Sequence, residues 1–161
     1  MTAAAHPNYL DTSALIKLFI DEVGSDRIRN YFGTQTVFFT SSLCFGETLG
    51  VLKAKNLRGE IGDNACYHFC SEFMVHVSQG LITVEDVGIT KWEIFSKVQS
   101  MAKDNMLDIS DAFLIVTLKR GFLSKFVGSS KPLLITADKK LASVARAQQL
   151  NVWDCLRENA P

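Results

Sequence analysis

The sequence has 161 residues, of which 47% are hydrophobic, enough for one domain with a sizeable core. Its 17 Lys and Arg residues balance 17 Asp and Glu residues, which argues against a protein that coats nucleic acid through excess positive charge. Residues 1–7 lack the regions of a signal peptide, and no apolar stretch approaches the ~20 residues of a membrane span. We therefore expect a cytoplasmic protein without a membrane segment.

Short apolar runs alternate with longer helical patterns along the chain. The patterns predict strands at residues 8–10, 36–40, 81–87, 133–136 and around 152. They predict helices at residues 13–20, 25–32, 41–55, 63–78, 90–103, 110–120 and 139–148, and residues 121–131 are the most loop-like stretch. Strands separated by helices indicate an α/β fold, a three-layer α/β/α sandwich with a central parallel sheet, over a single domain at residues 1–161.

The four cysteines, Cys44, Cys66, Cys70 and Cys155, suit a reducing compartment as small buried hydrophobic residues. Cys66 and Cys70 are spaced i, i+4 on a predicted helix. A zinc site would need a second ligand pair with zinc-like spacing, which the sequence lacks. We therefore expect no structural zinc.

Two carboxylates follow predicted strands, where ligands bind in a parallel sheet. Asp11 comes directly after the first strand, beside Thr12 and Ser13, and Asp138 lies just beyond the strand at residues 133–136. Each could instead be an N-cap that accepts backbone N–H bonds at the start of the next helix. Taken alone, neither residue decides between the two interpretations.

Two further carboxylates are predicted on helices. Asp111 shares a stripe with Leu114, Ile115 and Leu118, although it also stands in a first turn, where Asp108 or Ser110 is expected to cap the helix.

Glu47 is predicted in mid-helix, one turn after Leu43 and one before Val51, on what the pattern suggests is an apolar face. A cap cannot explain Glu47 there, and no Lys or Arg is spaced to pair with it. A lone buried carboxylate needs protonation, a partner or a cation. Four carboxylates that converge on one point would suit Mg²⁺ or Mn²⁺, which favour hard oxygen ligands.

Four segments in this order resemble the motifs of the PIN-domain nuclease family, and more closely its VapC-type toxin ribonucleases. The segments are Tyr9-Leu10-Asp11-Thr12-Ser13, Ser41-Ser42-Leu43-Cys44-Phe45-Gly46-Glu47-Thr48, Asp108-Ile109-Ser110-Asp111-Ala112 and Leu134-Ile135-Thr136-Ala137-Asp138. No single motif is specific, but their order and separation are. The resemblance implies that Asp11, Glu47, Asp111 and Asp138 are catalytic metal ligands, with support from Thr12, Ser13 and Thr136.

The resemblance also implies Mg²⁺- or Mn²⁺-dependent hydrolysis of RNA phosphodiester bonds, with one or two ions activating water. It implies an antitoxin partner, which the predicted helices at residues 41–55 and 63–78 could bind, and these helices could equally form a homodimer. Phe69 and Phe73 offer a pair there, although core packing is the commoner explanation. RNA affinity would depend on local basic residues, which could also be only a solvated surface. These are Lys17, Lys53, Lys55, Arg58, Lys119 and Arg120.

Two alternatives remain open. The first is a PIN-like module that binds RNA or protein without cleaving, against which the presence of all four acids weighs. The second is a phosphotransferase domain in which an Asp after the first strand accepts phosphate. Position 13 is Ser, where haloacid-type phosphotransferases have a second Asp, and Glu47 has no role in that scheme.

Overall fold

The computed structural model describes residues 6–35 and 37–161. The strands within these residues are β1 (Asn8–Leu10), β2 (Phe38–Ser41), β3 (Ile82–Glu85), β4 (Leu133–Thr136) and β5 (Asn151–Asp154). The α-helices are α1 (Thr12–Phe19), α2 (Ser25–Thr34), α3 (Ser42–Leu57), α4 (Asp63–Ser78), α5 (Trp92–Asn105), α6 (Ile109–Arg120) and α7 (Lys139–Ala147). Two short 3-10 turns, η1 (Phe122–Lys125) and η2 (Gly128–Ser130), shape the segment expected to be a loop.

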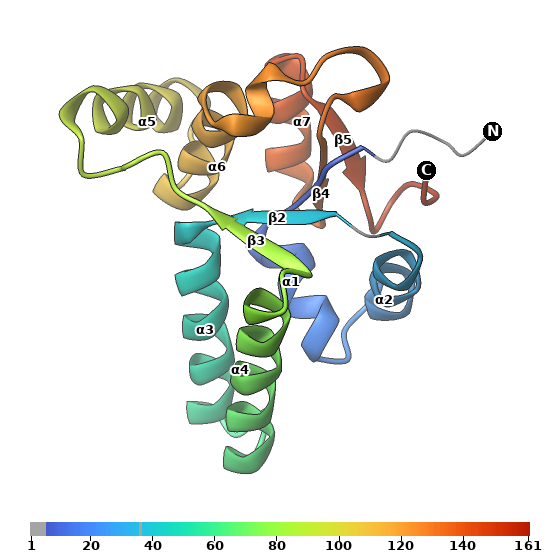
Figure 1. The fold of residues 1–161 in the computed structure, drawn as a ribbon. Helices are drawn as coiled ribbons and strands as arrows, with labels where there is room; N and C mark the ends of the chain where they lie inside the picture. Colours follow the sequence, from blue (N-terminus) through green and yellow to red (C-terminus); the bar gives the residue numbers. More distant parts are fainter. Residues whose placement is uncertain (1–5, 36) are drawn as a thin grey trace.

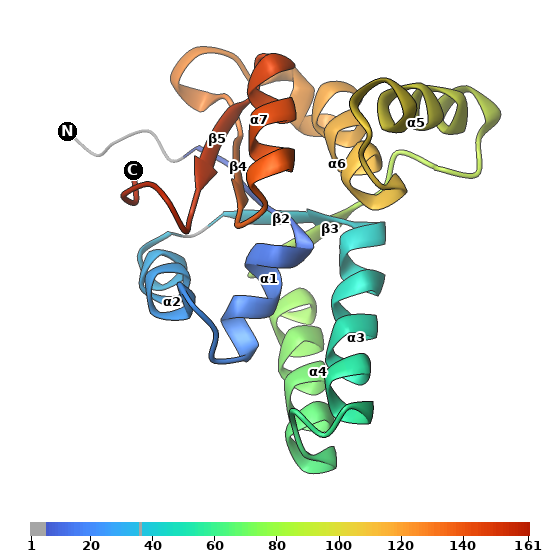
Figure 2. The same ribbon diagram turned by 180° about the vertical axis from the view of Figure 1, so that it is seen from behind.

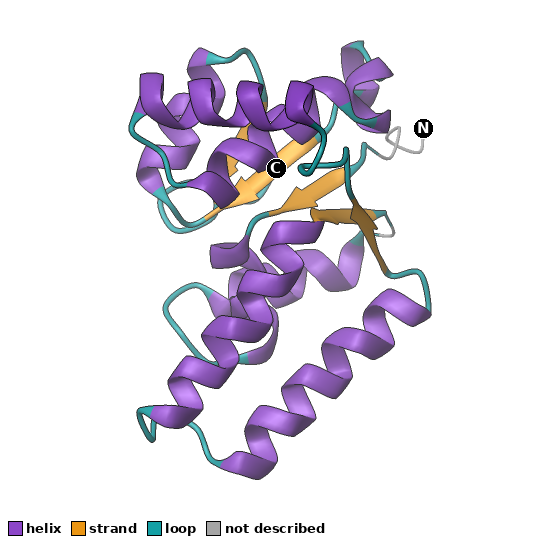
Figure 3. Cartoon of the chain, turned by 90° about the vertical axis from the view of Figure 1, so that its left-hand side faces the viewer, coloured by secondary structure: helices purple, strands orange, loops and turns teal. Residues whose placement is uncertain are grey.

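The strands form one parallel sheet in the order β3-β2-β1-β4-β5. Helices α1 to α4 lie on one face of this sheet and α5, α6 and α7 on the other (Figures 1 and 2). The side view in Figure 3 shows the sheet between the two helical layers, with the α3–α4 hairpin extending beyond it. The predicted α/β/α sandwich is therefore confirmed.

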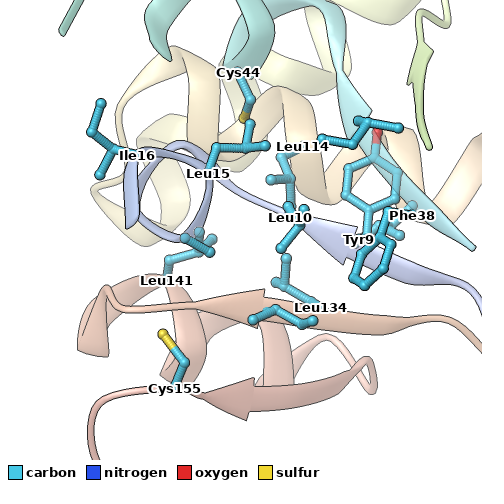
Figure 4. Close-up of a cluster of buried hydrophobic side chains, with 14 of the residues drawn as sticks. Tyr9, Leu10, Leu15, Ile16, Phe38, Cys44, Leu114, Leu134, Leu141 and Cys155 are labelled. Atoms are coloured by element: carbon cyan, nitrogen blue, oxygen red, sulfur yellow. The ribbon is translucent and has the colours of Figure 1, made fainter. Parts of the chain in front are cut away.

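The central strands and α6 form the middle of the core. Every residue of β4 is buried, as expected for a parallel strand covered on both faces. Leu10, Leu15, Leu114 and Leu134 come from four elements and belong to one cluster of buried side chains (Figure 4). Helix α6 is buried at every position from Ala112 to Leu118, since it packs between the sheet and neighbouring helices.

The predicted element boundaries differ from the structure by a few residues. The strand expected at residues 36–40 is found at Phe38–Ser41, and Thr36 lies outside the described residues. Residues 1–5, which bear on the expected absence of a signal peptide, also lie outside them. No helix in the described part of the chain is both long and apolar enough to cross a membrane.

Gly121 is the C-cap of α6, and its surroundings leave no room for a side chain. A Cβ atom there would lie 2.7 Å from the Thr117 carbonyl oxygen and would also collide with the Glu85 carboxylate. That carboxylate accepts a 2.6 Å hydrogen bond from the Phe122 N–H, which fastens the loop after α6 to β3. We expect Gly121→Ala to lower the free energy of unfolding by about 1–3 kcal/mol through overpacking, measured by urea denaturation.

The matched control is Gly50→Ala. Gly50 lies within α3, and a Cβ atom added there would meet nothing within 4 Å. Alanine should there raise the free energy of unfolding by about 0.5–1 kcal/mol because it restricts the unfolded chain and favours helix. Equal stability of Gly121→Ala and wild type would contradict the steric argument.

Candidate active site

The candidate site lies where the winding of the sheet reverses. From β1 the chain moves to β2 and β3, then crosses back to β4 on the other side of β1. Ligands in such sheets bind outside the carboxyl ends of the strands at this switch point. Leu10 pairs with Ile135 in register, so Asp11, which follows β1, stands beside Thr136, the last residue of β4.

Asp11 is the buried centre of this edge, with 2% of its surface exposed. Its carboxylate accepts hydrogen bonds from the Thr136 hydroxyl at 2.5 Å, the Ser13 hydroxyl at 2.8 Å and the Ala14 N–H at 2.8 Å. The last bond makes Asp11 the N-cap of α1. Asp11 therefore caps α1 and also bonds to Thr136 at the end of β4.

The two hydroxyls also accept N–H bonds from the residues that follow β4. The Ser13 hydroxyl accepts a bond from the Ala137 N–H at 2.8 Å, and the Thr136 hydroxyl accepts one from the Asp138 N–H at 2.9 Å. Residues 125 positions apart in the sequence thus belong to one hydrogen-bond network around Asp11.

The environment of Glu47 differs from the one that the sequence predicts. Its side chain is exposed, and the buried positions of α3 are Cys44, Thr48 and Leu52. The expected burial of Glu47 on an apolar face is therefore wrong, because the helix turns the neighbouring stripe toward the core. The Glu47 carboxylate accepts a 2.6 Å bond from the Thr12 hydroxyl, which connects it to the residue after Asp11.

The remaining acidic residues, Asp138, Asp108 and Asp111, lie at the N-termini of α7 and α6, on the other face of the sheet. Asp138 is an exposed N-cap of α7, and its carboxylate accepts bonds from the Lys140 and Leu141 N–H groups. Asp108 caps α6 by accepting a 2.8 Å bond from the Asp111 N–H, which confirms the expected capping role. Asp111 is half-buried in the first turn of α6.

The pKa shifts show that these carboxylates share one electrostatic environment. Burial raises the pKa of Asp11 to about 6, against the lowering effect of its hydrogen bonds from Thr136, Ala14 and Ser13, and the Asp138 charge raises it further. Burial also raises the pKa of Asp111 to about 7. The negative charges that add to this rise are Asp108, Asp11, Asp138 and Glu47. The charges of Asp11, Asp138 and Glu47 therefore all act on Asp111, and the charge of Asp138 also acts on Asp11.

The donor chemistry of the site suits a hard divalent cation, since carboxylate oxygens are what Mg²⁺ and Mn²⁺ prefer. Among residues 6–35 and 37–161, however, no group of three or more His, Cys, Asp or Glu side chains is arranged to hold a metal ion. Cys66 and Cys70 accordingly form no metal cluster there, and all four cysteines are free thiols.

One acid at this edge was missed by the sequence prediction. Asp154 ends β5, opposite Thr136 in the register, and is 3% exposed. Arg157 pairs with its carboxylate at 2.9 Å and donates to the Ala137 carbonyl at 3.3 Å. The signal in the sequence is the same as for Asp11, a carboxylate at the end of an apolar strand. Its partner Arg157 balances its charge, which distinguishes it from the four unbalanced acids.

Comparisons with known proteins bear on the family and the fold of the chain. The family model of the PIN domain matches residues 9–147. PAE2754 from Pyrobaculum aerophilum aligns with a TM-score of 0.59 and 19% identity, over 88% of this chain and 87% of that chain. FitAcB from Neisseria gonorrhoeae aligns with a TM-score of 0.57 and 13% identity, over 94% and 99%. Identities this low support the fold alone. A sequence comparison with curated proteins finds no match.

The raised pKa of Asp111 makes a pH-dependent prediction for the metal-free protein. The folded-state pKa of about 7 exceeds the unfolded value of about 3.9. Between these values the folded state binds more protons, so the free energy of unfolding falls as pH rises from 4 to 7. Asp111→Asn should therefore stabilise the metal-free protein at pH 8 by about 1–2 kcal/mol, a figure reduced for solvent screening of a half-buried group.

The gain should disappear near pH 4, where wild-type Asp111 is protonated. Chemical denaturation in chelator at both pH values measures it. Asp63→Asn is the control, because Asp63 also stands in the first turn of a helix but is exposed. A gain of the same size in both variants, or one independent of pH, would contradict mutual repulsion at the site.

Proposed function

The chain belongs to the PIN domain family, and we propose that it is a Mg²⁺- or Mn²⁺-dependent endoribonuclease. The PIN domain is a nuclease fold. The observation that carries the proposal is the set of four carboxylates, Asp11, Glu47, Asp111 and Asp138. Burial raises the pKa of Asp111 to about 7, and the charges of Asp108, Asp11, Asp138 and Glu47 add to this rise. A divalent cation at their centre would remove this repulsion.

The site's own residues would hold the reactive groups in place. Thr136, Ser13 and the Ala14 N–H fix the Asp11 carboxylate, while the Thr12 hydroxyl fixes Glu47. The N-terminus of α7 orients Asp138. Asp111 changes protonation near neutral pH when no cation is bound. The bound ion would supply activation of water and stabilisation of charge on the scissile phosphate.

We propose further that this nuclease acts as the toxin of a toxin–antitoxin pair, in the cytoplasm, as one domain over residues 1–161. The proposal follows from the motif resemblance to VapC-type toxins. An antitoxin or a second copy could use the outer face of α4, where Tyr67 and Met74 are 67% and 48% exposed. Phe73 is fully buried and Phe69 packs against the core, so that pair serves packing.

A non-catalytic RNA- or protein-binding module is the second candidate. The open arrangement of the carboxylates, with no metal-holding set among the described residues, favours it. The two candidates separate on activity, because only the nuclease requires the acids for turnover.

Incubation of the purified protein with structured RNA and Mg²⁺ or Mn²⁺ tests the nuclease. Asp11→Asn should reduce the cleavage rate at least a hundredfold, on the order of the loss of one electrostatic element in other active sites. Asp63→Asn, an exposed acid on α4, should cleave as wild type does. Equal cleavage by all three proteins would indicate a contaminant, and no cleavage across several metals and RNAs would favour the binding module.

Thermal unfolding with Mn²⁺ tests the metal site independently of activity. An ion at a hundred times its Kd stabilises the fold by about 2.7 kcal/mol, which should raise the melting temperature by several degrees. Glu47→Gln keeps an oxygen that can accept the Thr12 bond but removes one charge, so it should shrink the shift. An unchanged wild-type melting curve would count against a shared metal site.

A further inference from the structure

Two adjoining hollows lie on the opposite end of α6 from the carboxylates. The first, of about 440 Å³, lies among residues of α5, α6 and the end of α7. The second, of about 190 Å³, lies between the end of α6 and residues 123–132 and 148–150. Lys119 and Gln148 line both, so the two hollows adjoin at this pair of side chains. We call them together the α6-end groove; the helices that bound it lie side by side in the upper layer of Figure 2.

The α6-end groove is basic although the whole chain is neutral. Of the described residues that line it, Lys97, Lys119, Arg120 and Lys131 are basic and Asp104 is acidic. The other lining side chains are serines, asparagine and glutamines together with apolar residues such as Met101, Leu123 and Phe126. The basic and hydrogen-bonding groups among them are of the kinds that contact a phosphodiester backbone.

Among the described residues, most basic side chains of the groove have no acidic partner and hydrogen-bond to neutral groups or to no group. Lys119 donates to the Gln148 side chain at 2.7 Å, and Lys131 donates to the Gln149 carbonyl. The Arg120 guanidinium makes no hydrogen bond or ion pair within the described part of the chain. Lys97 pairs with the exposed Glu93 at 3.2 Å, a weak surface interaction.

Other basic residues that could have formed an RNA track are already used elsewhere. Lys17 pairs with Glu22, Lys55 with Glu22 and Glu60, and Arg58 with Glu60. Lys53 donates to the Asn56 side chain at 2.8 Å on the same helix. Stabilisation of α6 is the competing explanation for Lys119 and Arg120, because basic side chains are favourable at the C-terminus of a helix. That role does not account for Lys97 or Lys131, which lie on α5 and after η2 and enter the same groove.

We propose that the α6-end groove binds the backbone of the RNA strand that the carboxylate site cleaves. This inference rests on the proposed nuclease function and adds where the substrate is held. Asp111 and Arg120 stand nine residues apart on α6, about 14 Å along the helix axis. Since α6 is buried from Ala112 to Leu118, a strand that contacts both ends would pass over the helices packed against it and span more than this axial distance. The contacts are to phosphates, so they add affinity without sequence preference.

Lys119→Gln combined with Arg120→Gln tests the groove. Fluorescence anisotropy in chelator measures the Kd for a labelled single-stranded RNA over a range of KCl concentrations, so that binding is scored without cleavage. The double variant should raise Kd about tenfold at low salt and flatten the plot of log K against log salt by about 1.4, since each lost phosphate contact removes about 0.7.

The control is Lys53→Gln combined with Arg58→Gln, which removes the same charge near the far end of α3 (Figure 1). It should bind RNA as wild type does. If both double variants weaken binding equally, net charge alone matters and the groove is refuted. If the wild type cleaves RNA but the groove variant binds it unchanged, the groove is refuted while the nuclease stands. Melting temperatures of both variants check folding.

Discussion

The Asp11 carboxylate and the Thr136 hydroxyl meet across the two central strands, and the arrangement of the site depends on this contact. A buried carboxylate costs several kcal/mol unless hydrogen bonds replace its water. Three groups supply those bonds here, from the Thr136 and Ser13 side chains and from the first turn of α1. The same bonds set the position of α1 against β4, so the start of a helix and the centre of the site are held by one group.

Capping places the acids as well as stabilising the helices. Asp11, Asp108 and Asp138 each accept N–H bonds at a helix start. Because β1 and β4 end at the same edge of a parallel sheet, the caps that follow them meet there. The fold thus gathers negative charge as a consequence of how its helices begin. Hydrogen bonds counteract burial at Asp11 without cancelling its effect, so the pKa still rises to about 6. At Asp111 burial raises the pKa to about 7, and the surrounding charges add to the rise.

Helix α6 joins two regions of opposite charge. Its first turn holds Asp111 among acids, and its last turn holds Lys119 and Arg120 at the basic groove. Both ends follow the preference of the helix dipole for anions at the N-terminus and cations at the C-terminus. Since the residues between are buried on all sides, the helix is a rigid spacer that keeps the distance between the two regions constant.

Local sequence patterns are sufficient to predict the α/β/α sandwich and to mark Asp11, Asp108 and Asp138 as candidate N-caps, since hydrophobic period and cap chemistry are local properties. The order of the motifs also points to the PIN family.

The exposure of Glu47 could not be predicted, because a helix with weakly segregated polarity is oriented by its packing partners. Packing between distant segments decides that the Thr12 hydroxyl holds Glu47 and that a basic groove forms from α5, α6 and the segment after η2. It also decides that Asp154, neutralised by Arg157, ends its strand beside Thr136. Each of these arrangements depends on contacts between residues distant in the chain, which no local pattern records.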